Sequence, residues 1–286
     1  MKRVISYVVC AILLCSLLLF VYSCDEGDVK CIDIKLTNEQ YAFAVNKNDT
    51  ALLETVNSVV DTISANGTLD AIIQKYFSGD EESYKKVPAG TYDETKNQLV
   101  VATSIPFKPF EFSKYETGKG KLYRGIDIEI AAYIADELGI ELVIKEMSFK
   151  DVLNAVEAGD ADIAMAGLTV NAERQEQVAF SHTYYEASQM LIVRANDGTF
   201  DECRTKEDVE AILQSFDSTV TIGYQEETTS GLYLSGTQTN RRTAFNVTAK
   251  GYDTTAHAVQ ALINGEINYV IADGGPAKII VSDVNK

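Results

Sequence analysis

Arg174 is a cation at a position that would ordinarily favour an acid. Asn171 is expected to cap a short helix that begins at Ala172, so Arg174 would lie in the first turn, where the helix macrodipole disfavours positive charge. The neighbouring Glu173 is the residue type that suits such a turn. A guanidinium can hold a carboxylate through two parallel hydrogen bonds, which lysine does less well. We therefore predict that Arg174 binds a carboxylate; the alternative is a solvated surface arginine.

Two similar segments indicate where further polar groups would gather. Residues 153–167 (LNAVEAGDADIAMAG) align without a gap to residues 259–273 (VQALINGEINYVIAD). Each segment reads as the end of a helix, a glycine that stops it, an acidic residue and a buried strand. Two α/β lobes with the same plan would produce this similarity, but the pattern is also common as a local motif. Parallel sheets bind ligands beyond the carboxyl ends of their strands, and Gly167 and Asp273 lie at these ends. Asp273 could also cap a helix before Gly274.

The composition excludes several kinds of chemistry. The 286 residues include 2 His and 5 Cys, with no CxxC or HExxH motif, which argues against a transition-metal site and against a cofactor. The sequence has no GxxxxGK[ST] loop for ATP. The 25 Lys and Arg against 42 Asp and Glu give a net charge of −17, which disfavours nucleic acid or an anionic membrane surface as the main partner.

Residues 1–23 have the layout of an export signal. Lys2 and Arg3 precede an apolar run that ends at Ser23-Cys24, and the chain then becomes acidic. Cys24 is the predicted lipidation site and residues 24–29 a tether, although Tyr22 departs from the usual lipobox pattern; the alternative is an uncleaved anchor. The chain is therefore expected outside the cytoplasmic membrane, anchored to its outer face. Cys31 and Cys203 then remain, as a disulfide or as two separate buried thiols.

The remaining chain reads as alternating strands and helices, which predicts an α/β fold with largely parallel sheets. Residues 78–97 are polar, contain Gly79, Pro88 and Gly90, and are predicted to be a linker. The expected strands are 29–35, 41–45, 99–102, 141–145, 163–166, 189–193, 220–223 and 269–272, and the expected helices are 50–66, 69–77, 126–138, 150–158, 206–216, 228–235 and 254–264.

Several motifs resemble the bacterial extracellular solute-binding proteins of family 3, the periplasmic amino-acid-binding proteins of ABC importers. The motifs that carry the resemblance are residues 99–112 (LVVATSIPFKPFEF), 125–129 (GIDIE), 159–174 (GDADIAMAGLTVNAER), 178–181 (VAFS), 184–186 (YYE), 222–225 (IGYQ) and 269–273 (YVIAD). This resemblance implies a two-lobed periplasmic-binding-protein fold of type II. Each lobe would be a mostly parallel sheet flanked by helices, and a two-segment hinge would join the lobes.

The order of the motifs departs from that family. The family's closing segments resemble residues 32–45 and 67–77 of this chain, which come first. We therefore predict a circular permutation in which residues 78–97 join the usual termini; the alternative is an unrelated N-terminal helical module. Lobe 1 would comprise residues 36–77 and 98–193, and lobe 2 residues 30–35 and 194–286, with crossings near Leu191–Ala195 and Leu36–Ala42.

The resemblance also implies a binding site for a free α-amino acid. Ser104 stands where relatives with basic or amide ligands often have Asp, which argues weakly for a neutral ligand, and Glu226-Glu227 replaces a more usual glycine-containing turn. By resemblance, the ligand carboxylate would be bound by Arg174, Thr169, Gly167 and Thr229, the ammonium by Asp273 and Gly167, and the side chain by Ser104, Phe107, Phe149, Ala166 and Gln225.

The implied function is an extracytoplasmic receptor. The two lobes of a monomer, held at the membrane by a lipid anchor, would close around the amino acid and deliver it to the permease of an ABC importer, whose ATPase hydrolyses ATP. One alternative is a cyclohexadienyl-type dehydratase on the same fold, which needs a general acid in the cleft; no unclaimed carboxyl or histidine stands out there. The other is a sensor domain, which would require a signalling module.

Overall fold

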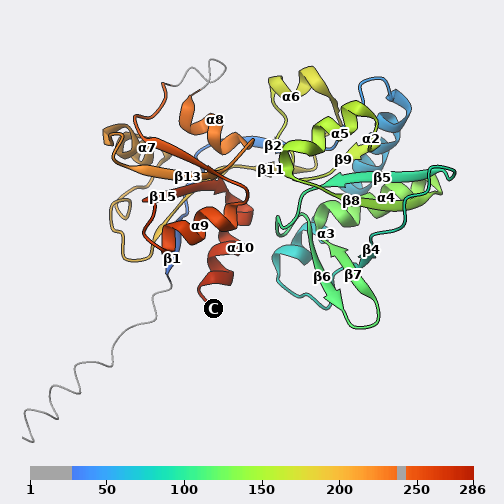
Figure 1. The fold of residues 1–286 in the computed structure, drawn as a ribbon, viewed down its shortest axis with the longest axis horizontal. Helices are drawn as coiled ribbons and strands as arrows, with labels where there is room; N and C mark the ends of the chain where they lie inside the picture. Colours follow the sequence, from blue (N-terminus) through green and yellow to red (C-terminus); the bar gives the residue numbers. More distant parts are fainter. Residues whose placement is uncertain (1–27, 237–242) are drawn as a thin grey trace, which may run out of the picture.

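Two five-stranded sheets of the same plan organise the chain, one in each lobe (Figure 1). The computed structural model describes residues 28–236 and 243–286, so the predicted signal, the lipidation site Cys24 and most of the tether lie outside the described residues. The lobe 1 sheet has the order β10(Ala179–Phe180), β3(Ala44–Val45), β9(Ile163–Ala164), β5(Gln98–Thr103), β8(Glu141–Glu146). The lobe 2 sheet has the order β1(Val29–Ile32), β12(Gln189–Arg194), β15(Tyr269–Asp273), β13(Thr221–Gln225), β14(Thr248–Tyr252).

The pairing directions show that the two sheets correspond strand by strand. In each sheet three neighbouring strands are parallel and the other two are antiparallel additions. The central strands β9 and β15 belong to the two similar segments found in the sequence. The two-lobed α/β fold is thus confirmed, with sheets that are mixed rather than uniformly parallel.

Alternating burial gives each sheet two apolar faces. In β5, Leu99 and Val101 join one core cluster while Val100 and Ala102 join another, because successive side chains of a strand point to opposite faces. Helices cover these faces. In lobe 1 they are α2(Thr50–Ala65), α3(Thr68–Phe77), α4(Ile126–Leu138), α5(Val152–Ala158) after the 3-10 turn η1(Phe149–Asp151), and α6(Ala172–Gln177). In lobe 2 they are α7(Lys206–Ser215), α8(Thr229–Ser235), α9(Thr255–Ile263) and α10(Gly274–Val284).

The N-terminal segment is built into both lobes. Strand β1 forms the edge of the lobe 2 sheet, and β3 lies inside the lobe 1 sheet between β9 and β10. Helix α2 begins at the predicted cap, where the Asp49 carboxylate accepts from the Leu52 amide at 3.0 Å. The strand predicted over 41–45 is instead two short strands, β2(Glu39–Tyr41) and β3, because β2 leaves the sheet to pair with β11(Tyr185–Ala187).

The β2–β11 ladder lies where the chain passes between the lobes. Gln189 already pairs with Asp273 in the lobe 2 sheet, so β12 belongs to lobe 2 and not, as the sequence led us to expect, to the end of lobe 1. The crossing predicted at Leu191–Ala195 therefore lies a few residues earlier, near Ala187–Gln189. The second crossing runs close to its predicted position at Leu36–Ala42, where the Leu36 amide donates to the Gln189 carbonyl at 2.9 Å.

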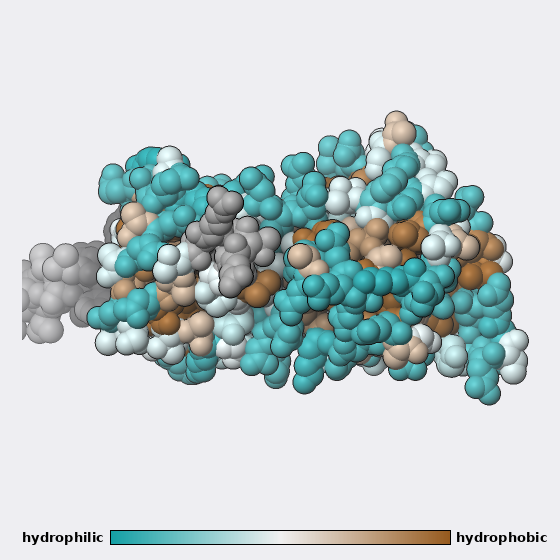
Figure 2. Space-filling model, turned by 90° about the horizontal axis from the view of Figure 1, so that it is seen from above, coloured by the Kyte–Doolittle hydropathy of each residue, from teal (hydrophilic) through white to brown (hydrophobic). Residues whose placement is uncertain are grey.

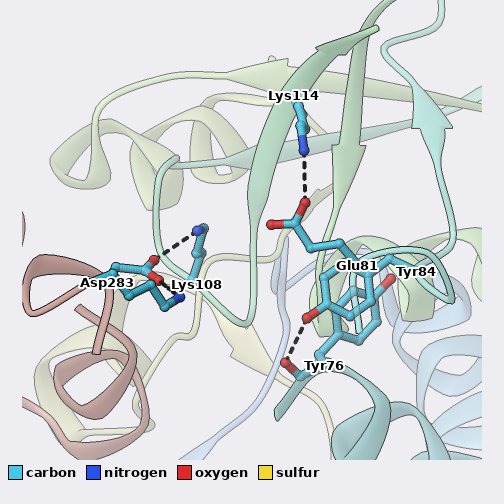
Figure 3. Close-up of polar contacts among 7 residues, drawn as sticks. Tyr76, Glu81, Tyr84, Lys108, Lys114 and Asp283 are labelled. Atoms are coloured by element: carbon cyan, nitrogen blue, oxygen red, sulfur yellow. Dashed lines mark hydrogen bonds and ion pairs between the residues drawn. The ribbon is translucent and has the colours of Figure 1, made fainter. Parts of the chain in front are cut away.

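Residues 78–97 are more ordered than a polar linker. Tyr84 is buried, stacks on Tyr76 with ring centroids 4.5 Å apart, and donates its hydroxyl to the Tyr76 carbonyl at 3.1 Å (Figure 3). Val87 lies in β4(Val87–Pro88), which extends the hairpin of β6(Phe112–Glu116) and β7(Gly120–Arg124). Two isolated apolar residues create no period, which is why the sequence did not indicate this packing.

A surface ion pair joins the lobes beside the cleft. The Lys108 ammonium of lobe 1 lies 2.9 Å from the Asp283 carboxylate of α10 (Figure 3).

Most of the surface seen from above is hydrophilic (Figure 2), in keeping with the acidic composition. The Cys31 and Cys203 thiols are both free. Within residues 28–236 and 243–286, no helix is long and apolar enough to cross a membrane, and no His, Cys, Asp and Glu side chains gather as a metal site.

Candidate functional site

Arg174 extends from lobe 1 across the cleft to lobe 2. The Asn171 side chain caps α6 by accepting from the Arg174 amide at 2.8 Å, as the sequence predicts. The guanidinium donates to the Thr169 carbonyl at 2.8 Å and to the Glu227 carbonyl of lobe 2 at 3.0 Å. It lies 5.4 Å from the centre of the Phe149 ring. Burial lowers the pKa of Arg174, while the carboxylates of Asp273 and Glu39 oppose this shift.

Glu227 resolves the loop geometry that the sequence left open. Its φ of 61° is left-handed, the only such value at a non-glycine residue in the part of the chain that the structure describes. A glycine would adopt this conformation at lower cost. The loop therefore keeps the turn that a glycine-containing sequence would make, and that turn directs the Glu227 carbonyl at Arg174.

Asp273 faces the cleft from the end of β15. It occupies the N-cap position of α10, but its side chain makes no capping hydrogen bond. Its carboxylate accepts instead from the side-chain amide of Gln189 at 2.9 Å. Burial and the nearby charge of Glu39 raise the pKa of Asp273 to about 7, against the lowering effects of Tyr41, Gln189 and Arg174.

Glu39 joins the two lobes through two threonines that line the cleft. One oxygen of its carboxylate accepts from the hydroxyls of Thr169 in lobe 1 and Thr229 in lobe 2, both at 2.8 Å. Gln189 also donates to this oxygen, at 3.3 Å. Since each threonine hydroxyl has a single proton, both hydroxyls can only accept from any further group.

The position of Gly167 leaves no room for a side chain. At φ 54°, a Cβ atom there would lie 2.5 Å from the Phe107 ring. Its amide donates to the buried Asp127 carboxylate at 3.0 Å, and the Tyr184 hydroxyl donates to the other Asp127 oxygen at 2.6 Å. This network fixes the end of the β9 segment against the start of α4.

The structure brings nine of the ten sequence-predicted binding residues around one hollow. Its empty volume is about 420 Å³, counting the open mouth, and its walls come from both lobes. The predicted residues in these walls are Ser104, Phe107, Phe149, Gly167, Thr169, Arg174, Gln225, Thr229 and Asp273. Ala166 is the exception: it is 2% exposed and packs in the lobe 1 core, because the short β9 segment turns its side chain away from the cleft.

A comparison with protein families identifies the chain. Residues 99–280 match the model of the bacterial extracellular solute-binding proteins, family 3. The chain belongs to this family. The family match, the fold and the cleft between two lobes agree with the resemblance seen in the sequence.

Individual relatives of this solute-binding protein cover only parts of it. The arginine-binding extracellular protein ArtP of Bacillus subtilis is 32% identical over 103 residues, which are 36% of this chain and 38% of ArtP. A probable histidine-binding protein of Campylobacter jejuni is 29% identical over 63% of this chain and 61% of its own length. The chain thus spans less than two thirds of either relative. An ancestral arginine-binding protein, solved with glutamine bound, is 30% identical with a TM-score of 0.53, covering 66% of this chain and 74% of that chain.

Two acidic residues of the solute-binding protein's cleft were missed from the sequence. Glu39 lies in a crossing segment without periodicity, and only its position in the hinge could have singled it out. Glu111 follows Phe110 in the resembling motif and lines the hollow fully buried. It also corrects the expectation that no unclaimed carboxyl stands in the cleft: it was overlooked because a lone Glu before a strand gives no sign of burial.

The buried acids make stability depend on pH. Burial raises the pKa of both Asp127 and Asp273 from 3.8 to about 7, so the folded protein binds protons more tightly than the unfolded chain. The free energy of unfolding of the unliganded protein is therefore expected to fall as the pH rises from about 5 to about 8. Urea denaturation across this range measures the effect, and Asp273→Asn should reduce it. A flat profile in the wild type would contradict the burial of these carboxyls.

Proposed function

We propose that this protein is an extracytoplasmic receptor that closes its two lobes around one free α-amino acid with a neutral or polar side chain. The observation that carries the proposal is the pairing of Arg174 and Asp273 across one cleft, a cation and an acid from different lobes. An α-amino acid carries a carboxylate and an ammonium on the same carbon atom, so a cation and an acid that line one hollow can bind both. Calorimetric titration with the common amino acids tests it.

The assignment of roles follows from which groups have hydrogen-bonding capacity left. Arg174 and the backbone amides of Thr169 and Thr229 would bind the carboxylate. The Gly167 amide, which the sequence assigned to the carboxylate, already donates to Asp127, so Gly167 would contribute only its carbonyl, to the ammonium. Asp273 would accept from the ammonium, together with the Gly167 carbonyl. The Thr169 hydroxyl already donates to Glu39, so it would contribute as an acceptor.

The side chain of the ligand would lie between the lobes beside aromatic rings. Phe107 and Phe149 offer apolar walls, and Ser104 and Gln225 add polar groups. The Gln225 side chain is itself held by the Thr255 hydroxyl at 3.2 Å, which favours a fixed pocket shape. The mechanism would be hinge closure, in which Arg174 contacts lobe 2 only when the lobes are together.

Delivery of the ligand to a permease would require the protein to lie at a membrane. We propose that an ABC permease reads the closed form and that its ATPase hydrolyses ATP. Lipidation at Cys24 would hold a monomeric receptor at the outer face of the cytoplasmic membrane. Radiolabelled lipid incorporation, lost in Cys24→Ala, tests the anchor.

Ser104 is expected to determine selectivity between neutral and basic ligands. Ser104→Asp adds a carboxylate to the side-chain pocket, so the affinity for arginine relative to glutamine should rise roughly tenfold or more through a charge-assisted hydrogen bond. Competition calorimetry with the two amino acids measures the ratio, with Ser104→Asn as the uncharged control. An unchanged ratio would show that the pocket lies elsewhere.

One observation favours a second candidate function, a dehydratase. Glu111 supplies a buried carboxyl in the cleft whose pKa burial raises well above its usual range, which suits a general acid. A cyclohexadienyl dehydratase of Pseudomonas aeruginosa is 37% identical over 86 residues, 31% of its length. Turnover of prephenate or arogenate by the wild type would favour this candidate over a receptor.

A further inference from the structure

Glu111 is fully buried. Its backbone is hydrogen-bonded, but its carboxyl group is not. Its amide donates to the Phe107 carbonyl at 3.1 Å, and its carbonyl accepts from the Phe107 amide at 2.7 Å. Both carboxyl oxygens are buried and accept no hydrogen bond from the described residues. A buried polar group without partners destabilises the fold, so a purely structural role gives no reason for this residue.

The side chain lines the hollow together with residues that we assign to the ammonium. Glu111, Gly167 and Asp273 line the same space. The ionisable groups that act on Glu111 come from three elements: Asp127 at the start of α4, Asp273 at the end of β15, and the Tyr184 hydroxyl before β11. The cation Arg174 is not among the groups that shift it.

Burial and these neighbours all favour the same protonation state of Glu111. Burial, and then the carboxyls of Asp127 and Asp273, raise the pKa of Glu111 well above its usual range. Burial therefore favours the protonated, neutral form of this side chain. A cation brought close to it would reverse the balance, because an opposite charge favours the ionised form.

We propose that Glu111 is a second acceptor for the ligand ammonium and that it gives up its proton when the amino acid binds. The proposal rests on the proposed function, since an α-ammonium held by Asp273 also faces Glu111. It assigns the unpartnered oxygens of Glu111 a partner that arrives with the ligand.

Proton release makes the affinity depend on pH. The unliganded protein carries a proton on Glu111 and the complex does not, so binding releases about one proton through this residue, and the association constant rises with pH by up to about tenfold per unit. Asp273, with a pKa of about 7, adds a fractional release of its own.

Calorimetry in buffers of different ionisation enthalpy measures the number of protons released. In phosphate and Tris at about pH 7, the wild type is expected to release about one to one and a half protons for each amino acid bound. Glu111→Gln keeps the shape and the neutral charge, and it should lower the release by about one proton while binding persists. Glu141→Gln, which alters a half-exposed carboxyl on β8, is the matched control and should change nothing.

The possible outcomes separate this inference from the proposed function. Binding of an amino acid to the wild type without proton release would overturn the role of Glu111 and leave the receptor intact. An equal release from wild type and Glu111→Gln would do the same. If no amino acid binds, both fail. Should Glu111→Gln not fold, the release by the wild type and its pH profile still decide the matter.

Discussion

Arg174→Ala is expected to weaken binding of the preferred amino acid by at least about a hundredfold, since truncating one partner of a buried charged pair costs several kcal/mol. In the structure the guanidinium is held by the Thr169 carbonyl and the Phe149 ring of lobe 1 and, across the cleft, by the Glu227 carbonyl. Alanine removes both the charge and the two-pronged geometry. Isothermal titration calorimetry with the wild-type ligand measures the loss.

Two further variants make this prediction specific. Arg174→Lys keeps the charge but not the planar fork, so it should recover only part of the affinity. Glu173→Ala alters the exposed neighbour in the same helical turn and should bind like the wild type. Binding by a folded Arg174→Ala within about threefold of the wild type would contradict the assignment of Arg174 to the ligand carboxylate.

A chain that begins at Gln98 is expected not to fold. It would lack β3, an inner strand of the lobe 1 sheet, and β1, an edge strand of the lobe 2 sheet. It would also lack α2 and α3, whose buried side chains belong to the largest lobe 1 core cluster. Losing an inner strand exposes backbone groups and apolar surface together. Circular dichroism and urea denaturation should show no cooperative transition.

Reordering the same residues is expected to rescue the fold. If the chain is a circular permutation, residues 98–286 followed by residues 29–77 through a short linker should fold and bind the same amino acid with similar affinity. The two ends to be joined lie side by side, because the side-chain amide of Asn285 donates to the Val29 carbonyl at 2.8 Å. A stable, ligand-binding product from Gln98 alone would overturn the permutation.

Most of the fold could be predicted because apolar periodicity and stop signals are local. Helix α4 ends at the predicted Gly139 with φ 66°, and α2 begins at the predicted Asp49 cap. The predictions that were wrong depend on contacts between residues far apart in the sequence. The pairing of Gln189 with Asp273 places β12 in lobe 2. The two residues are too far apart in the sequence for a local pattern to reveal this contact. The packing of Tyr84 on Tyr76 was missed for the same reason.

The residues of the site show the same difference between local and long-range information. Arg174, Thr169 and Asp273 could be proposed because they lie in motifs that resemble a family and beside the ends of strands. Glu39 and Glu111 could not, since what distinguishes them is that distant segments surround them. Glu39 accepts from the Thr229 hydroxyl across 190 positions of the sequence, and the pKa of Glu111 is raised first by burial among distant segments and then by the acids of other elements. Contacts between distant segments, not residue type, place Glu111 in the cleft and Glu39 beside it.

The most direct test of the central claim is a titration of the wild-type protein with free amino acids and with their blocked derivatives. The geometry predicts that at least one neutral or polar amino acid binds with one molecule per chain. The same amino acid amidated at its carboxylate or acetylated at its nitrogen should bind far more weakly, because Arg174 and Asp273 would each lose a partner. Absence of binding by every free α-amino acid, or equal binding of the blocked forms, would contradict the account.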